Sequence, residues 1–218
     1  DHRDLHSFPT RRSSDLKELG VVAVVNPYWH YETPLYETLE CPFLGKERAE
    51  HMYYLKSYLD EGIVMSQASD FPVTVPPNTM FCLHMMVNRF NPETSKKSYF
   101  PEECIDVESA LKVLTIGGAY ENFLDTRKGT IRVGKDADFV VLDQDVTTIP
   151  KEDIYKTKVL ETWIDGETPF FIIEYTLIGS VVVPASARND VTINSSKASE
   201  NAIKAPETIP GIICGIVT

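Results

Sequence analysis

Apolar residues in the first half of the chain gather into two short runs on either side of a helical pattern. Residues 20–27 form a near-continuous, β-branched run closed by Asn-Pro, which is typical of a strand buried on both faces in a parallel sheet. Residues 46–59 carry apolar positions at helical spacing and end at Asp-Glu-Gly, which favours a helix. Residues 63–72 predict a second strand whose polarity rises towards its end. A strand, a helix and a strand in this order predict a right-handed parallel unit.

The second half of the chain predicts one amphipathic helix and then short strands. Asp106 is a typical N-cap, and apolar residues follow it at helical spacing as far as Gly117-Gly118, where glycine suits a helix end. Residues 128–143 alternate short β runs around a Gly-Lys turn, which favours a hairpin. Residues 159–166 predict a further strand and turn. The Gly-Lys pair lacks the spacing of a phosphate-binding loop, so we exclude that interpretation.

Length and composition are those of an ordinary globular chain. The 218 residues are 43% hydrophobic and 24% charged, and at roughly 150 residues per domain they predict one to two domains rather than disorder. A net charge of -11 opposes binding to a phosphate backbone, so we expect no nucleic-acid partner. The longest apolar stretch, residues 168–185, is interrupted by two prolines and a glutamate, and we predict no membrane span. Cys41, Cys82, Cys104 and Cys214 form no Cys-x-x-Cys pair, which favours a reduced, cytoplasmic setting.

The two ends of the chain differ from its middle. Residues 1–16 show neither a helical nor a strand period, and they resemble the translation of a short-read sequencing adapter. We expect an artefact there, with a natural polar arm as the alternative, and a gene that begins near Lys17 as the C-terminal piece of a longer protein. Residues 168–218 are poor in charge. We interpret them as a poorly specified tail, either translated out of frame or a genuine extra β-segment.

Two residues are candidates for chemistry by their position or type alone. Asp70 ends the second predicted strand, where sheets and barrels bind ligands and where a carboxylate can hold a metal or accept a proton. A helix N-cap or a turn aspartate before Phe-Pro is the alternative. Arg89 could order the loop over such a site or bind a substrate carboxylate, and a solvated or ion-paired arginine is the alternative.

Several of these segments together resemble one enzyme family. They are Ser-Asp-Phe-Pro at residues 69–72, the helix that begins at Asp106, and Gly-Thr-Ile-Arg-Val-Gly-Lys-Asp-Ala-Asp-Phe-Val-Val-Leu-Asp at residues 129–143. In this order they resemble the C-terminal part of the amidohydrolase superfamily, closest to amidohydrolase family 3, over about residues 17–167. The resemblance implies an α/β fold: the end of a metal-dependent (β/α)8 barrel in residues 17–125, with barrel strands seven and eight, and part of a small β-sandwich domain in residues 126–167.

The resemblance also implies a chemistry. The family's eighth-strand aspartate corresponds to Asp70, which would touch a divalent metal, with zinc expected, and take a proton from the water that attacks a C–N bond of a small-molecule substrate. His30 lies just past a strand end where related enzymes place a substrate-contacting residue, with a loop role as the alternative. The family's other metal ligands lie on earlier strands, and catalytic zinc needs three protein ligands. We therefore expect a parent amidohydrolase for bonds other than peptide bonds, able to form a homo-oligomer, and a chain that alone is inactive and binds metal poorly.

A different class of function is a non-enzymatic α/β module that binds a partner through its loop rich in Tyr and Trp. Tyr28, Trp29, Tyr31 and Tyr36 would form that surface, although packing of the loop explains them equally well. For folding, we expect the strand in residues 20–27 to leave an open edge, so that the chain made alone aggregates or stays loosely packed.

Overall fold

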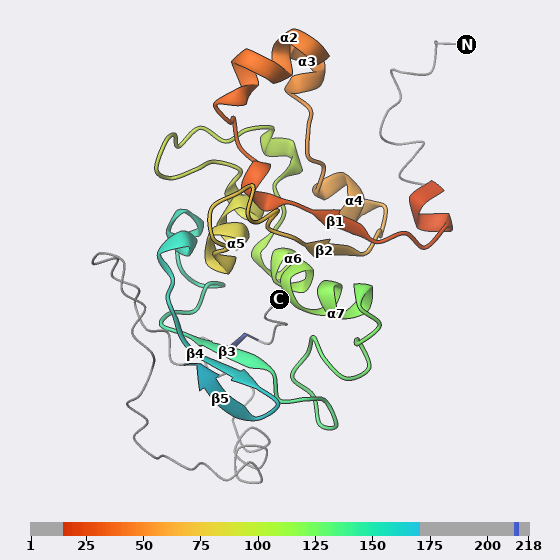
Figure 1. Ribbon diagram of the computed structural model, residues 1–218, viewed down its shortest axis with the longest axis vertical. Coiled ribbons are helices and arrows are strands. Elements are labelled where there is room, and N and C mark those ends of the chain that lie inside the picture. Colours follow the sequence, from red (N-terminus) through yellow and green to blue (C-terminus); the bar gives the residue numbers. More distant parts are fainter. Residues whose placement is uncertain (1–14, 171–211, 214–218) are drawn as a thin grey trace.

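The computed structural model describes residues 15–170 and 212–213. Figure 1 shows an upper part, where helices pack around two short strands, and a lower part with a small antiparallel sheet. The fold is mixed α/β, as predicted. The segment predicted to be an artefact lies outside the described residues except for Asp15 and Leu16, and so does most of the predicted tail. Within the described part, no helix has the length and apolarity that crossing a membrane requires.

The two strands of the upper part are β1 (Ala23–Val25) and β2 (Met65–Gln67). They pair in parallel, which confirms the predicted parallel pairing. Burial on both faces is wrong, because Val25 is 6% exposed whereas Val24 is 52% exposed. No other described strand pairs with β1 or β2, so the outer edge of each strand has no strand neighbour in the described chain. Whether the chain aggregates for that reason stays a prediction.

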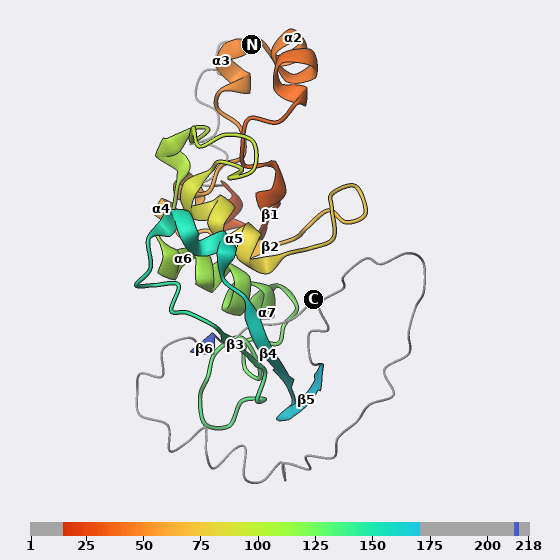
Figure 2. The same cartoon turned by 90° about the vertical axis from the view of Figure 1, so that its left-hand side faces the viewer.

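Short helical segments make up most of the upper part. After β1 come η2 (Pro27–Trp29), η3 (Tyr36–Glu40), α2 (Cys41–Leu44), α3 (Lys46–Ala49) and α4 (Lys56–Asp60). After β2 come α5 (Thr79–Asn88), η4 (Pro101–Glu103), α6 (Val107–Lys112), η5 (Val113–Gly117) and α7 (Gly118–Glu121), and η6 (Lys151–Lys156) lies between two strands of the lower sheet. Figure 2 shows α2 and α3 as a lobe that stands apart from the remaining helices.

The single helix predicted for residues 46–59 is wrong, because the chain there forms α3, an irregular stretch and then α4. The guanidinium of Arg89 donates hydrogen bonds to the backbone carbonyls of Met52, at 3.0 Å, and Tyr53, at 2.8 Å. Tyr53 itself has a φ of 62°, which no helix interior adopts. A cation from another element thus takes the carbonyls that a continuous helix would have bonded internally.

Helix α4 is capped by a residue far away in the sequence. The carboxylate of Glu103, a buried residue, accepts hydrogen bonds from the backbone N–H of Leu55 at 2.7 Å and of Ser57 at 3.0 Å. These are N–H groups at the start of a helix, which have no partner inside it. Glu103 therefore does for α4 what a local N-cap residue usually does.

The predicted helix at Asp106 begins as expected and ends later than expected. The Asp106 side chain accepts a hydrogen bond from the backbone N–H of Ser109 at 2.8 Å, which confirms the N-cap. The stop at Gly117-Gly118 is wrong, since η5 and α7 continue the helical path to Glu121. A Cβ on Gly117 would lie 1.9 Å from the carbonyl oxygen of Met65. Glycine is needed there for close approach to β2 and not for ending the helix.

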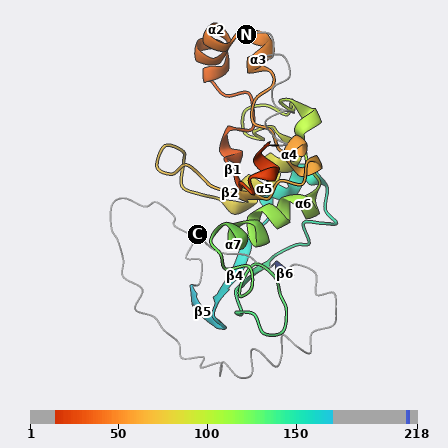
Figure 3. The ribbon, with the colours of Figure 1, turned by 90° about the vertical axis from the view of Figure 1, so that its right-hand side faces the viewer.

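The lower sheet has the order β5-β4-β3-β6, with antiparallel pairing throughout (Figure 3). Its strands are β3 (Phe139–Leu142), β4 (Val159–Ile164), β5 (Glu167–Phe170) and β6 (Ile212–Ile213). The strand and turn predicted for residues 159–166 are confirmed, and Asp165 and Gly166 form the turn with φ values of 55° and 76°. The hairpin predicted for residues 128–143 is wrong, because only β3 is a strand there and it pairs with β4.

Both parts of the molecule share one apolar core, with α5 at its centre. Eight of the ten residues of α5 are buried. The cluster draws on β1, β2, α5, α6, η5, β3, η6 and the loops between them: Val25, Leu55, Met65, Met80, Leu83, Met86, Val87, Ile105, Ala110, Val113, Leu142, Val146 and Ile154. This shared core holds the carboxyl ends of β1 and β2 in place relative to the sheet.

Candidate active site

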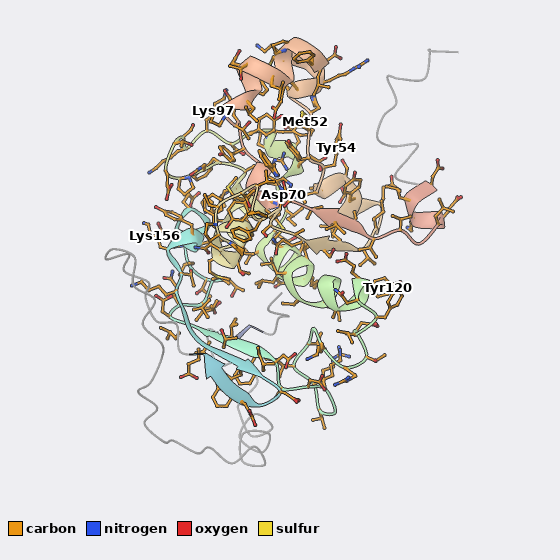
Figure 4. The ribbon with its side chains drawn as sticks, in the orientation of Figure 1. Met52, Tyr54, Asp70, Lys97, Tyr120 and Lys156 are labelled. Carbon is orange, nitrogen blue, oxygen red and sulfur yellow. The ribbon has the colours of Figure 1, made fainter. Side chains whose placement is uncertain are left out.

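The carboxyl ends of β1 and β2 lie side by side because the two strands are parallel. Trp29 and His30 follow β1, and Ser69 and Asp70 follow β2. The indole N–H of Trp29 donates a hydrogen bond to Oδ2 of Asp70 at 3.2 Å, across 41 positions of sequence. Figure 4 shows Asp70 in the central part of the molecule, between the helices of the upper half. In α/β proteins this edge of a sheet is where ligands bind.

The backbone of Asp70 opens a turn while its carboxylate stays exposed. Its φ is 62°, a left-handed conformation that aspartate tolerates better than most residues. Its carbonyl oxygen accepts hydrogen bonds from the N–H of Val73 at 2.8 Å and of Thr74 at 3.2 Å. The turn interpretation of Asp70 therefore holds for its backbone. Its side chain forms no ion pair with any residue of the described ranges and is accessible to a ligand.

The loop that follows Asp70 is tied to the loop that follows β1. The hydroxyl of Tyr28 donates to the carbonyl of Pro76 at 3.3 Å and accepts from the N–H of Asn78 at 2.6 Å. Its ring stacks on Phe81 with 5.2 Å between centroids, and burial raises the pKa of the Tyr28 hydroxyl. Tyr28 and Tyr36 are 8% and 6% exposed, so two of the four aromatic residues considered for a docking surface pack inside the protein.

His30 lies at the same edge but is enclosed, with 1% of its surface exposed. Its Nδ1 has no hydrogen-bond partner among the described residues, and its ring lies 5.7 Å from that of Tyr53. Burial, and then the nearby charge of Arg89, hold the pKa of His30 well below its ordinary value. His30 is therefore a neutral imidazole at neutral pH, with one ring nitrogen unused by the described chain.

Arg89 is fully buried behind this edge and orders loops. Its Nε donates to the carbonyl of Tyr99 at 2.7 Å, while the two terminal nitrogens bind Tyr53 and Met52. Burial lowers the pKa of Arg89 to about 10. Of the roles that the sequence suggested for Arg89, these contacts support the ordering of loops. With its donors engaged by carbonyls, Arg89 is not a free cation for a substrate carboxylate.

The described residues do not make a metal site by themselves. They contain no group of three or more His, Cys, Asp or Glu side chains placed to hold a metal ion. Asp70 is one carboxylate, whereas a catalytic zinc site needs three protein ligands. The described part of the chain therefore does not complete a catalytic zinc site.

The motif in residues 129–143 lies away from this edge and has a structural task. Nζ of Lys128 pairs with the carboxylate of Asp138 and lies 3.3 Å from Oδ2 of Asp136. Oδ1 of Asp138 accepts a hydrogen bond from the N–H of Asp165 at 2.8 Å, in the turn between β4 and β5. Nζ of Lys135 donates to two backbone carbonyls of the same loop, at 2.6 and 2.9 Å. The motif fastens its loop to the lower sheet.

Comparison with known proteins decides the family. A family model described as "Amidohydrolase family" matches residues 7–170. This chain belongs to the amidohydrolase family. The resemblance inferred from residues 17–167 is thereby confirmed, and the match also takes in part of the segment before Lys17.

Two curated relatives of this amidohydrolase chain are each much longer than the chain. YtcJ of Bacillus subtilis (strain 168), an amidohydrolase by its name, is 28% identical over 124 residues, which are 57% of this chain and 23% of YtcJ. The N-substituted formamide deformylase of Arthrobacter pascens is 29% identical over 137 residues, 62% of this chain and 24% of the deformylase. The chain spans about a quarter of the length of these relatives.

A solved structure shows a partial likeness to this amidohydrolase chain. It is an amidohydrolase from Thermotoga maritima MSB8, with a TM-score of 0.48, 24% sequence identity, and coverage of 74% of this chain and 34% of that one.

Trp29 is the residue of the candidate site whose role the sequence did not indicate. The sequence placed Trp29 only in an aromatic loop, and its bond to Asp70 joins positions 41 residues apart. No local pattern could have found this contact. Parallel pairing of the two predicted strands was the available clue, because it brings the residues after both strands to one edge.

Proposed function

We propose that the protein is a metal-dependent amidohydrolase that hydrolyses C–N bonds other than peptide bonds in a small molecule, with Asp70 as its catalytic base. One observation carries this proposal. In a chain of the amidohydrolase family, an exposed carboxylate lies three residues after the parallel strand β2 and accepts a hydrogen bond from an indole N–H at 3.2 Å. The name of one relative, N-substituted formamide deformylase, supports an amide as the substrate class.

The proposed reaction requires one proton to move twice. Water attacks the carbon of the C–N bond, and Asp70 accepts the proton that the water loses. The C–N bond then breaks, and the protonated Asp70 returns the proton to the departing nitrogen, which leaves as an amine. The hydrogen bond from Trp29 keeps one oxygen of the carboxylate occupied, so the other oxygen is the one that meets the water. His30 is 1% exposed, so the role we propose for it is packing of the loop after β1 and not contact with the substrate.

In the proposed architecture, β1 and β2 are the seventh and eighth strands of a (β/α)8 barrel, residues 17–125 end that barrel, and residues 126–167 belong to a small β-domain. A divalent metal, with zinc expected, would supply Lewis acidity at the site. Asp70 can contribute one ligand, and the described residues do not complete the set. We propose a longer, cytoplasmic enzyme in which other segments supply the remaining ligands. Its length is supported by the curated relatives, of which this chain covers about a quarter. We propose that this chain is inactive alone.

The test replaces Asp70 by asparagine in the enzyme that contains this chain. Asparagine keeps the shape, tolerates the positive φ and can still accept the indole hydrogen bond, but it cannot take a proton. We expect kcat/KM for an N-substituted formamide to fall by at least about 10²-fold. The measurement is amine release with added Zn²⁺ or Mn²⁺.

The matched control is Asp60→Asn, which removes an exposed carboxylate of α4 that pairs with Lys56. The Asp60→Asn variant should leave turnover unchanged. Both variants should have the same urea midpoint of unfolding as the wild type. Near wild-type turnover in Asp70→Asn would contradict the assignment. Metal-dependent hydrolysis by residues 17–218 alone would contradict the claim that the chain is inactive without further segments.

A further inference from the structure

The loop that runs from Asp70 to Asn78 lies on the surface of the protein. Of residues 71–78, all but the half-buried Thr74 are exposed. Figures 2 and 3 show this loop, between β2 and α5, reaching out from the remaining elements. Local bonds shape its first turn, where the carbonyl of Asp70 accepts two backbone N–H groups. Because the loop past Asp70 buries no side chain of its own, hydrogen bonds from other elements decide where it lies.

Two consecutive aromatic residues of η2 provide these hydrogen bonds, one at each end of the loop. At the start, the indole N–H of Trp29 donates to Oδ2 of Asp70 at 3.2 Å. At the end, the hydroxyl of Tyr28 accepts the N–H of Asn78 at 2.6 Å and donates to the carbonyl of Pro76 at 3.3 Å. Within the described chain, no element other than η2 and the adjoining α5 forms hydrogen bonds with the loop past Asp70.

Tyr28 is itself held firmly, so it can serve as a fixed point for the loop. Its side chain is 8% exposed, and its ring stacks on Phe81 of α5 with 5.2 Å between centroids and 28° between planes. Burial raises the pKa of the Tyr28 hydroxyl, which therefore keeps at neutral pH the proton that it donates to Pro76. The far end of the loop is thus attached to a ring that is packed between η2 and α5.

The carboxylate of Asp70 depends on this attachment. Asp70 is exposed, and among the described residues its side chain accepts a single hydrogen bond, the one from Trp29. One bond leaves a carboxylate free to turn about it, whereas a general base must stay within hydrogen-bond reach of the water that it deprotonates. A second fixed point on the same loop restricts that motion.

We propose that Tyr28 is a positioning residue for the reaction, which holds the far end of the loop and so keeps the Asp70 carboxylate against Trp29 and in place for the water. The inference rests on the proposed function, in which Asp70 is the base. Tyr28 acts through the loop and touches neither the substrate nor the water.

The test removes the Tyr28 hydroxyl with Tyr28→Phe, which keeps the ring that stacks on Phe81. The matched control is Tyr99→Phe. Tyr99 is 7% exposed and its hydroxyl donates to the carbonyl of Ala49 in α3, so this variant also loses a buried tyrosine bond but leaves the loop untouched. Both changes are made in the enzyme that contains this chain. The measurements are kcat and KM for an N-substituted formamide, the urea midpoint, and the fluorine NMR signal of Trp29 in enzyme made with fluorinated tryptophan, assigned by its loss in Trp29→Phe.

We expect kcat of Tyr28→Phe to fall about fivefold while KM changes by less than about twofold, because the base is misplaced and the substrate contacts remain. The Trp29 signal should shift or broaden, since the indole loses its fixed partner. In Tyr99→Phe, kcat and the Trp29 signal should stay as in the wild type, even where the urea midpoint falls. In the Asp70→Asn background, Tyr28→Phe should lower kcat no further.

Three results would overturn the proposal: an unchanged kcat in Tyr28→Phe, an unchanged Trp29 signal in that variant, or an equal loss of kcat in both tyrosine variants. The last result would show that lost stability alone explains the effect. If the wild-type enzyme hydrolyses no formamide, the proposed function is contradicted for this substrate class. The Trp29 signal then still decides whether Tyr28 controls the contact between Trp29 and Asp70.

Discussion

The carboxyl edge of β1 and β2 and the loop of residues 129–143 each depend on an aspartate, and the two aspartates are held in opposite ways. Asp138 is 6% exposed, pairs with Lys128 and accepts the N–H of Asp165. Asp70 is exposed and accepts the indole N–H of Trp29. A carboxylate whose bonds are satisfied inside the chain stabilises a fold, and one that keeps an oxygen open can serve a ligand.

The motif that is most specific to the family is not the one at the candidate site. Residues 129–143 carry the most specific part of the family resemblance, yet they fasten a loop to the lower sheet. The motif around Asp70 is short because the proposed chemistry needs one carboxylate after one strand end. In the loop of residues 129–143, several neighbouring side chains each make a contact that requires a particular residue type. Such a loop therefore leaves a longer pattern in the sequence than a site whose residues come from distant positions.

The largest expected effect is on the structural side of this comparison. Asp138→Ala should lower the free energy of unfolding by about 2 kcal/mol, because the partly exposed Lys128 loses its closer partner and the Asp165 N–H loses its acceptor. Asp138→Asn, which retains an acceptor for that N–H, should cost less. Urea unfolding measures both. Asp70→Asn serves as the contrast and should change stability by less than about 0.5 kcal/mol; equal losses at the two sites would break the distinction.

The contributions of the two regions to stability should also depend on pH at opposite ends of the scale. The pKa of His30 lies well below its ordinary 6.5, so only the unfolded chain takes up a proton as the pH falls through that value. The stability that neutral His30 contributes is complete above pH 6.5 and is lost below it, by up to about 1.4 kcal/mol per pH unit. The pKa of Lys128 is raised by its hydrogen bond to Asp138, so its contribution is complete below 10.5 and is lost as the pH rises further.

Urea unfolding between pH 5 and pH 8 checks the acidic side. His30→Asn should flatten the loss of stability below pH 6.5, whereas the same change at the exposed His51 should not. An identical slope in wild type and His30→Asn would show that His30 is accessible to protons in the folded protein.

The smallest expected effect sharpens the description of the site. Trp29→Phe keeps an aromatic ring but removes the N–H that orients Asp70, and we expect kcat/KM to fall about fivefold without a change in the urea midpoint. A purely structural role would lower the midpoint instead. In the Asp70→Asn background the same change should have little further effect, because the group that Trp29 positions is then already inactive.

The sequence by itself determined the features that rest on local patterns. Apolar runs predicted two strands whose parallel pairing the structure confirms, and the side chain of Asp106 lies within reach of its own helix start. The strand before the Asp165-Gly166 turn is equally local. Residues 69–72, the helix that begins at Asp106 and residues 129–143 together predicted the family that the family match confirms. Periodicity, caps and tight turns involve residues a few positions apart, so composition and order suffice to predict them.

Only the tertiary structure decided the features that depend on residues far apart in the sequence. Arg89 takes the carbonyls of residues 52 and 53 and so divides a predicted helix in two. Gly117 lets a helix touch the carbonyl of Met65 where a glycine pair predicted an end. The bond from Trp29 to Asp70, which defines the candidate site, exists only because parallel strands bring their ends together. The Arg89 bonds satisfy a buried polar group and Gly117 permits close packing between elements, and those demands arise only once the chain has packed.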